Sequence, residues 1–383
     1  MVRKPPSPAD EALLNAASQR GLRVTATQLE RWRAAGLLPP NARQRPGRGQ
    51  GSSSTPAPDA VELVVWLAQH ARPGQRPSSL ALRAFAEELP VPEPTVRKAW
   101  RAAIRRIELP GEKEHPPPAG GDRADWAWSL AERAANPSTT VVIPRRMRRI
   151  DDRIAAAGIS WALPQVAQYD RGPDIDEPVD SRGFATYAAV AALSGGPELT
   201  GAAMAPYARA MLPAGAASPT AYWLEHPDGP GRDPSEISNG AGLSLLPTGD
   251  IREDLLRTID ESTMAQLRAG WHAAAQMRTW ALAQCDAVEA ELDTGQLGEA
   301  TLAWMAGAAL GVSRLLIRDV LRDQRFTTTS QVTTAVMLLW MGGALQRLRV
   351  LVPDGQFELL PELLPPFLHD LAGVPTSAQD GCP

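Results

Sequence analysis

Residues 25–40 read TATQLERWRAAGLLPP, a short segment with a clear start and a clear end. A threonine at 25 or 27 can cap a helix, because its hydroxyl accepts a hydrogen bond from a free backbone N–H of the first turn. Gly36 suits the position that follows a helix, and two prolines at 39 and 40 prevent its continuation. The sequence therefore predicts a helix from 25 to about 35.

The composition of this helix suits a contact with DNA. A helix about 10–12 Å across fits the major groove, where short polar side chains reach base edges and long basic ones reach phosphates. Leu29 faces the core. A solvated face for the two arginines, with the tryptophan in the core, is the alternative. The candidate DNA-binding residues are Thr25, Thr27, Gln28, Arg31, Trp32 and Arg33.

Helical periodicity also surrounds this segment. It predicts helices over 10–20, 59–71, 80–89 and 94–107. The intervening stretch 41–58 is a loop rich in glycine, serine, proline and arginine. Three arginines of this loop can reach a neighbouring minor groove or the phosphate backbone of DNA: Arg43, Arg45 and Arg48.

The N-terminal part resembles the MerR family of winged helix-turn-helix transcription regulators. The likeness covers about residues 9–90 and rests on Val24-Thr25, Leu29, Trp32 and Gly36–Pro40, followed by the basic loop and by Gly74 with Ser79-Leu80. It implies a DNA-binding helix followed by a basic wing. The chain departs from the family at Glu30 and Arg31, where arginine and tyrosine are usual, and at 51–55, where GSSST replaces the usual end of the wing. The helix from Pro94 is cut at Pro110, whereas the family often continues into a dimerising coiled coil.

The segment 82–104 has a helix–turn–helix rhythm of its own. Its last helix carries a second set of candidate DNA contacts, placed by the same logic as the first. A two-helix packing element with a basic outer face is an equal alternative. The residues are Thr95, Arg97, Lys98 and Arg101.

Charge is distributed unevenly along the chain. The net charge is −4, yet residues 1–110 hold 17 Lys/Arg against 9 Asp/Glu, and the remainder is acidic. A basic N-terminal part joined to an acidic remainder is expected where one domain binds a polyanion. Two cysteines suit a reducing cytoplasm, and arginine in place of lysine, with abundant alanine, is typical of a GC-rich bacterial genome. No run is long enough to span a membrane.

The fold class that we expect is all-α. A winged helix-turn-helix domain would occupy 9–107, a Pro/Gly-rich linker 108–122, and a partly helical middle region 123–249 with a loop at 213–249. A C-terminal helical bundle would occupy 250–375 and serve sensing, dimerisation or partner binding. Helical patches are expected at 126–135, 146–157 and 186–193 in the middle region, and at 250–282, 297–323 and 329–352 in the bundle.

No catalytic or metal-binding pattern emerges, so we expect no enzyme, no cofactor and no metal. Cys285 is interpreted as a core residue rather than a thiol sensor. The stretch 311–321 (GVSRLLIRDVL) echoes another helix-turn-helix pattern but follows an apolar segment, which favours a core helix. Tryptophans and methionines of the bundle favour a plain core over a pocket for a hydrophobic effector. The set comprises Trp271, Trp280, Trp304, Trp340, Met264, Met277, Met305, Met337 and Met341.

Taken together, these features predict a cytoplasmic, sequence-specific DNA-binding transcriptional regulator whose partner is double-stranded DNA. A non-enzymatic helical protein that uses its N-terminal fold against a protein partner, for example in a phage or mobile element, is the alternative. A homodimer, and a small hydrophobic effector or a protein partner at the C-terminal bundle, stay open. We expect no membrane partner.

Overall fold

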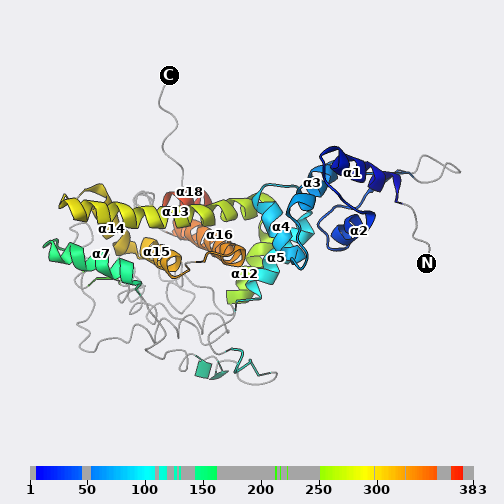
Figure 1. Ribbon diagram of the computed structural model, residues 1–383. Helices are drawn as coiled ribbons and strands as arrows, with labels where there is room; N and C mark the ends of the chain where they lie inside the picture. Colours follow the sequence, from blue (N-terminus) through cyan, green and yellow to red (C-terminus); the bar gives the residue numbers. More distant parts are fainter. Residues whose placement is uncertain are drawn as a thin grey trace. The chain divides into compact units, whose positions relative to one another are not determined.

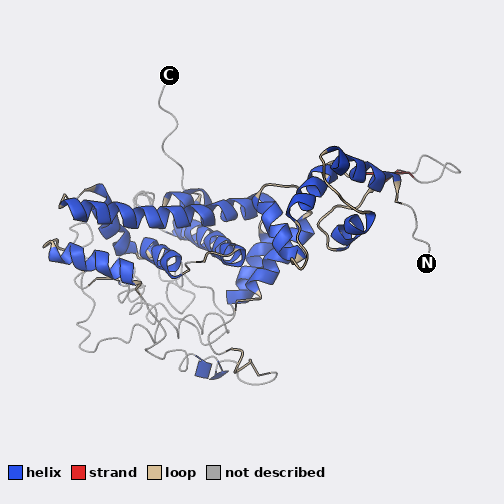
Figure 2. Cartoon of the chain, viewed as in Figure 1, coloured by secondary structure: helices blue, strands red, loops and turns tan. Residues whose placement is uncertain are grey.

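The computed structural model describes residues 6–44, 53–107, 112–118, 125–126, 129–130, 143–161, 212–213, 216, 222, 251–296, 298–323, 325–351 and 364–373. The protein is mostly helical, with almost no strand, so the all-α expectation is confirmed (Figure 2). No helix in the described part of the chain is long and apolar enough to cross a membrane. The expected helix at 186–193, and most of the expected loop at 213–249, lie outside the described residues.

The chain divides into two compact units. The first contains residues 1–106 and also 259–268; the second contains 107–258 and 269–383. The first boundary lies close to the expected end of the N-terminal domain at 107. Residues 259–268 were expected in the C-terminal bundle, and the structure instead assigns them to the first unit.

The first unit begins with α1 (Pro8–Gln19) and α2 (Ala26–Ala34), which the turn at Gly21 joins (Figure 1). Ser7 caps α1, and Pro8 occupies its first turn, where the missing N–H is not needed. Leu13 and Leu29 are fully buried, so the two helices contribute to one core. The prediction that Leu29 faces the core is confirmed.

A two-stranded antiparallel hairpin follows α2. Strand β1 (Ala42–Gln44) pairs with β2 (Ser53–Thr55), with Arg43 opposite Ser54. Composition predicts a loop over 41–58 and the family resemblance implies a basic wing there, but three-residue strands are too short to leave a periodic signal in the sequence.

Three helices complete the N-terminal part: α3 (Ala60–His70), α4 (Pro77–Ala86) and α5 (Glu93–Ile104). Phe85 of α4 and Trp100 of α5 meet edge to face, with ring centroids 5.8 Å apart. Both side chains are almost fully buried. An aromatic pair of this geometry is worth about 0.5–1.5 kcal/mol beyond the burial of its surface, so it fixes α4 against α5.

A segment that lies much later in the sequence, residues 259–268, completes this unit. It comprises the end of α12 (Ile251–Glu261) and the start of α13 (Met264–Thr294). Ile259 and Leu267 are fully buried, and the guanidinium of Arg268 lies 5.5 Å from the ring centroid of Phe85. The first unit is therefore built from two parts of the chain about 160 residues apart.

The second unit is a helical assembly of α7 (Arg145–Ala156), the rest of α12 and α13, α14 (Glu299–Leu310), α15 (Val312–Arg322), α16 (Thr328–Leu351) and α18 (Pro366–Ala372). Two glycines allow helices to approach closely. A Cβ on Gly270 of α13 would meet Leu339 of α16 at 2.8 Å, and one on Gly342 would meet the carbonyl oxygen of Leu371 at 2.6 Å. Glycine permits such backbone approaches.

Four of the nine tryptophan and methionine residues named in the sequence are buried, and the other five are half-buried. Trp271, Met277, Trp304 and Met305 are buried, and Trp280 packs edge to face against Phe367, with centroids 5.6 Å apart. These positions agree with a plain core, the interpretation that the sequence favoured.

A buried ion pair ties three helices of the second unit together. Arg314 of α15 donates two hydrogen bonds to the carboxylate of Asp151 in α7, at 3.0 and 2.6 Å. The indole N–H of Trp304 in α14 donates to the same carboxylate at 2.9 Å. Asp151 lies in the middle of α7, and Arg314, which is 1% exposed, belongs to a core helix as expected.

Candidate nucleic-acid interface

The N-terminus of α2 is closed by a reciprocal pair of hydrogen bonds. The hydroxyl of Thr25 accepts from the backbone N–H of Gln28 at 3.2 Å, and the Gln28 side chain accepts from the backbone N–H of Thr25 at 2.8 Å. This capping box satisfies two N–H groups that a helix start leaves free. Both side chains therefore already have a structural role, and Thr27, half-buried in the first turn, is outside that cap.

The three consecutive residues that suggested DNA binding occupy different environments. Arg31 is exposed, whereas Trp32 is only 6% exposed and belongs to the core of the first unit. The Arg33 side chain is 20% exposed. Of these three, only Arg31 extends freely into solvent, so the cationic surface is narrower than the sequence suggested.

Arg33 holds α2 to the rest of the unit. Its guanidinium lies 2.5 Å from the carboxylate of Asp10 in α1 and donates to the side chain of Asn41 at 3.0 Å. Partial burial opposes ionisation of Asp10, but hydrogen bonds from Ser7 and Arg33 outweigh it, and the pKa of Asp10 is lowered. An ion pair of this kind competes with any phosphate for Arg33.

The basic loop is described only in part. Arg43 lies on β1, but its side chain is not described. Arg45 and Arg48 lie outside the described residues, so their expected contribution stays a prediction.

The second candidate set faces the protein itself. The hydroxyl of Thr95 donates to the carbonyl oxygen of Gly36 at 2.7 Å. Arg97 donates to carbonyl oxygens at the end of α12, including that of Ser262 at 2.8 Å, and Arg101 donates to the carboxylate of Asp260 at 2.7 Å. Lys98 is the one exposed member of the four.

The α5 face is therefore not the free basic surface that the sequence suggested. Arg97 satisfies carbonyl groups that the C-terminus of α12 leaves without partners, which is a favourable place for positive charge, and Arg101 pairs with the carboxylate of Asp260. The partner lies about 160 residues away along the chain. Nothing in the local sequence of α5 indicates it, although the acidic run of α12 (REDLLRTIDE) is a complementary signal.

Cys285, Arg314 and Arg318 contribute nothing to a surface, whereas Arg322 at the end of α15 is exposed. Burial raises the pKa of the Cys285 thiol to about 11, and the side chain is fully buried. Since the thiolate is the reactive form, this cysteine is inert in the folded state. Arg318, like Arg314, is buried.

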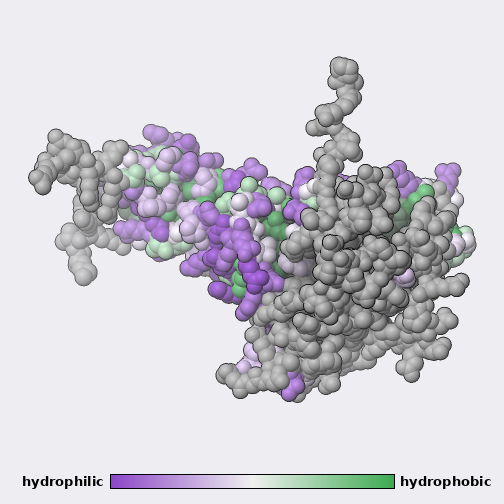
Figure 3. Space-filling view, turned by 180° about the vertical axis from the view of Figure 1, so that it is seen from behind, coloured by the Kyte–Doolittle hydropathy of each residue, from purple (hydrophilic) through white to green (hydrophobic). Residues whose placement is uncertain are grey.

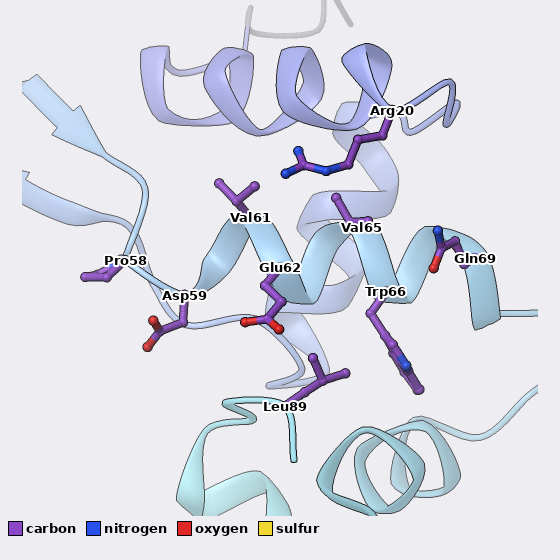
Figure 4. A pocket seen from close by; sticks show the side chains of 9 residues that line it. All are labelled: Arg20, Pro58, Asp59, Val61, Glu62, Val65, Trp66, Gln69 and Leu89. Atoms are coloured by element: carbon purple, nitrogen blue, oxygen red, sulfur yellow. The ribbon is translucent and has the colours of Figure 1, made fainter. Parts of the chain in front are cut away.

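The first unit also carries a shallow hollow of about 500 Å³ along α3 (Figure 4). Arg20 at the end of α1 lies on one side of it and Leu89 on the other, and Val61 and Val65 project from α3. Charged and apolar side chains therefore share its lining. Hydrophilic side chains also dominate the face of this unit in Figure 3, with smaller hydrophobic areas between them.

No group of three or more metal-ligating side chains occurs among the described residues. Comparison of the chain with models of known families, with curated proteins and with solved structures finds no match.

Proposed function

We propose that the chain is a sequence-specific DNA-binding transcriptional regulator of MerR-like type, and that α2 makes the central contact. The observation that carries this proposal is the division of α2 into two faces. Leu29 and Trp32 are buried on one side, while Arg31 is exposed on the other. A short, capped helix with an exposed arginine on its outer face, next to exposed Glu30, fits the major groove and a phosphate strand beside it.

The surroundings of α2 support this assignment. Because the Arg33–Asp10 ion pair and the capping box fix the helix, Arg31 projects from a rigid base. The hairpin follows immediately and carries Arg43, and the loop at its tip contains two further arginines. A base contact from Thr25 or Gln28 would compete with the helix cap. Thr27 is therefore the better candidate among the three polar residues.

The test is the affinity of the full chain for duplex DNA at several salt concentrations. Arg31→Ala removes one phosphate contact, so the slope of log affinity against log salt should fall by about 0.9. The loss should be similar for all DNA sequences, because phosphates carry no sequence information. Arg325→Ala removes an exposed arginine of the second unit and is the matched control. Fluorescence anisotropy with a labelled duplex measures the affinity and the salt slope of both variants.

Arg31 has to be replaced alone. Arg33→Ala would leave Asp10 partly buried without its guanidinium partner and would destabilise the unit, so a combined variant confounds folding with binding. An Arg31→Ala protein with unchanged affinity and salt slope contradicts the proposal. A wild-type protein that enriches no motif from a pool of random duplexes contradicts sequence specificity, and one that binds no duplex leaves a protein partner as the function of the N-terminal unit.

A further inference from the structure

The first turns of α7 carry an unusual concentration of positive charge. Arginine occupies positions 145, 146, 148 and 149, and the first turn holds no acidic residue. The positive end of the helix dipole lies here, so cations are unfavourable and acidic side chains are preferred. Helix stability therefore does not explain these arginines.

Pairing within the protein accounts for only some of the α7 arginines. Arg146 contacts the carboxylates of Glu289 and Asp286 on α13, and Arg153 contacts Asp293 at 2.7 Å. The hydrogen bonds that Arg146 donates to the carboxylate of Glu289 raise the pKa of Arg146 and lower the pKa of Glu289. These two arginines attach α7 to α13.

Three arginines on the adjoining face are exposed, and two of them have no ion-pair partner among the described residues. Arg145 and Arg148 are exposed and form no ion pair with the described residues. Arg149 is 67% exposed and has one contact to Glu289, at 3.3 Å. Their spacing of three and four residues places them side by side on one helix face, which we call the α7 arginine face. Exposed Asp152, one turn further on, bounds it.

The opposite face of α7 is firmly anchored. Met147, Ile150 and Ile154 are fully buried, and Asp151 binds Arg314 through two hydrogen bonds. The arginines therefore project from a fixed support, and binding a partner does not require ordering the helix first. Such preorganisation lowers the entropic cost of association.

We propose that the α7 arginine face contacts the phosphate backbone of duplex nucleic acid. It would add a second, sequence-independent contact to that of α2, and this inference rests on the proposed function. Guanidinium groups bind phosphate oxygens through paired hydrogen bonds. Duplex DNA carries one charge per about 1.7 Å of its axis, so a row of exposed arginines on a rigid helix can meet several phosphates.

The experiment compares Arg145→Ala/Arg148→Ala with wild type in the full chain, using a labelled random duplex between about 50 and 200 mM salt. Loss of two phosphate contacts should lower the salt slope by about 1.8. The double lysine variant, Arg145→Lys/Arg148→Lys, should retain most of that slope because it keeps the charge. Arg257→Ala/Arg325→Ala removes two exposed arginines elsewhere in the second unit and should change the slope little.

The outcomes separate this inference from the proposed function. If the double alanine variant and the control pair behave alike, net charge alone acts and the α7 arginine face is not a contact. If Arg31→Ala has no effect but the α7 variant weakens binding, the proposed role of α2 fails and this inference stands. Binding to phosphatidylserine vesicles that excess duplex does not displace would assign the face to a membrane surface and overturn the inference, as would a wild type that binds no duplex.

Discussion

Gly36 satisfies two requirements that no residue with a side chain meets. Its φ of +74° is strained for any L-residue with a Cβ, and a Cβ there would clash with the hydroxyl oxygen of Thr95. We predict that Gly36→Ala lowers the free energy of unfolding of the first unit by about 1–3 kcal/mol, measured by urea denaturation.

The control at the same scale is Gly21→Ala. Gly21 has a φ of +73°, but a Cβ at this residue would have no other atom within 4 Å. The Gly21→Ala variant therefore reports the backbone strain without the clash, and it should lose less stability than Gly36→Ala. Equal losses for the two variants would show that the contact with Thr95 places no constraint on the turn.

A carboxylate on one helix caps another helix in the second unit. Glu291 near the end of α13 accepts hydrogen bonds from the hydroxyl and the backbone N–H of Thr301, at 2.7 and 2.8 Å, and from the backbone N–H groups of Gly298 and Ala300. The hydroxyl of Thr301, followed by these backbone groups, lowers the pKa of Glu291 to about 2. The negative charge also faces the positive end of the α14 dipole.

The pH dependence of this cap has a definite sign. Because the folded pKa is lowered from 4.5 to about 2, the carboxylate stabilises the fold fully above pH 4.5 and progressively less as the pH falls towards 2. The stability difference between wild type and Glu291→Gln should therefore shrink over that interval in thermal unfolding. Glu261→Gln, at an exposed carboxylate, is the control. A difference that stays constant from about pH 6 to pH 2.5 argues against the capping role.

Helix positions follow from local sequence, and helix surroundings do not. The predicted helices at 10–20, 59–71 and 94–107 lie within about three residues of α1, α3 and α5, because capping residues, glycine, proline and periodicity act locally. Arg33 of α2 pairs with Asp10, and Arg101 of α5 pairs with Asp260. These carboxylates come near the arginines only when the chain folds. The sequence could therefore indicate a basic helix but could not say which of its arginines face solvent.

At the scale of the whole molecule, a segment near residue 260 belongs with the N-terminal unit. Residues 259–268 supply buried Ile259 and Leu267 together with carbonyl oxygens that bind Arg97. The carboxylate of Asp260 in this segment also pairs with Arg101, so part of the basic charge counted over residues 1–110 is neutralised inside the unit. The net charge of that region therefore overstates the basic surface that is available to a polyanion. Exposed Arg31 is therefore better evidence for a contact with DNA than the composition of the region.

Distant segments also converge on the Asp151 carboxylate, which joins α7, α14 and α15. Removing one partner leaves a buried charge without compensation, which typically costs about 3–5 kcal/mol. We predict a loss of this size for Asp151→Ala, measured by the thermal transition of tryptophan fluorescence and calibrated with urea. Replacing Asp151 and Arg314 together with Leu and Met should recover much of the stability, since no charge then stays buried.

The neighbouring residue provides the control. Asp152 is exposed on the other side of α7, so Asp152→Ala should change stability by no more than about 0.5 kcal/mol. Comparable losses of stability for Asp151→Ala and Asp152→Ala would mean that the ion pair does not organise the unit.

Asp151→Ala also tests the α7 arginine face, because Asp151 anchors the helix that carries this face. If that face binds phosphates as a rigid surface, Asp151→Ala should weaken duplex binding at a temperature where most of the protein is still folded, whereas Asp152→Ala should not.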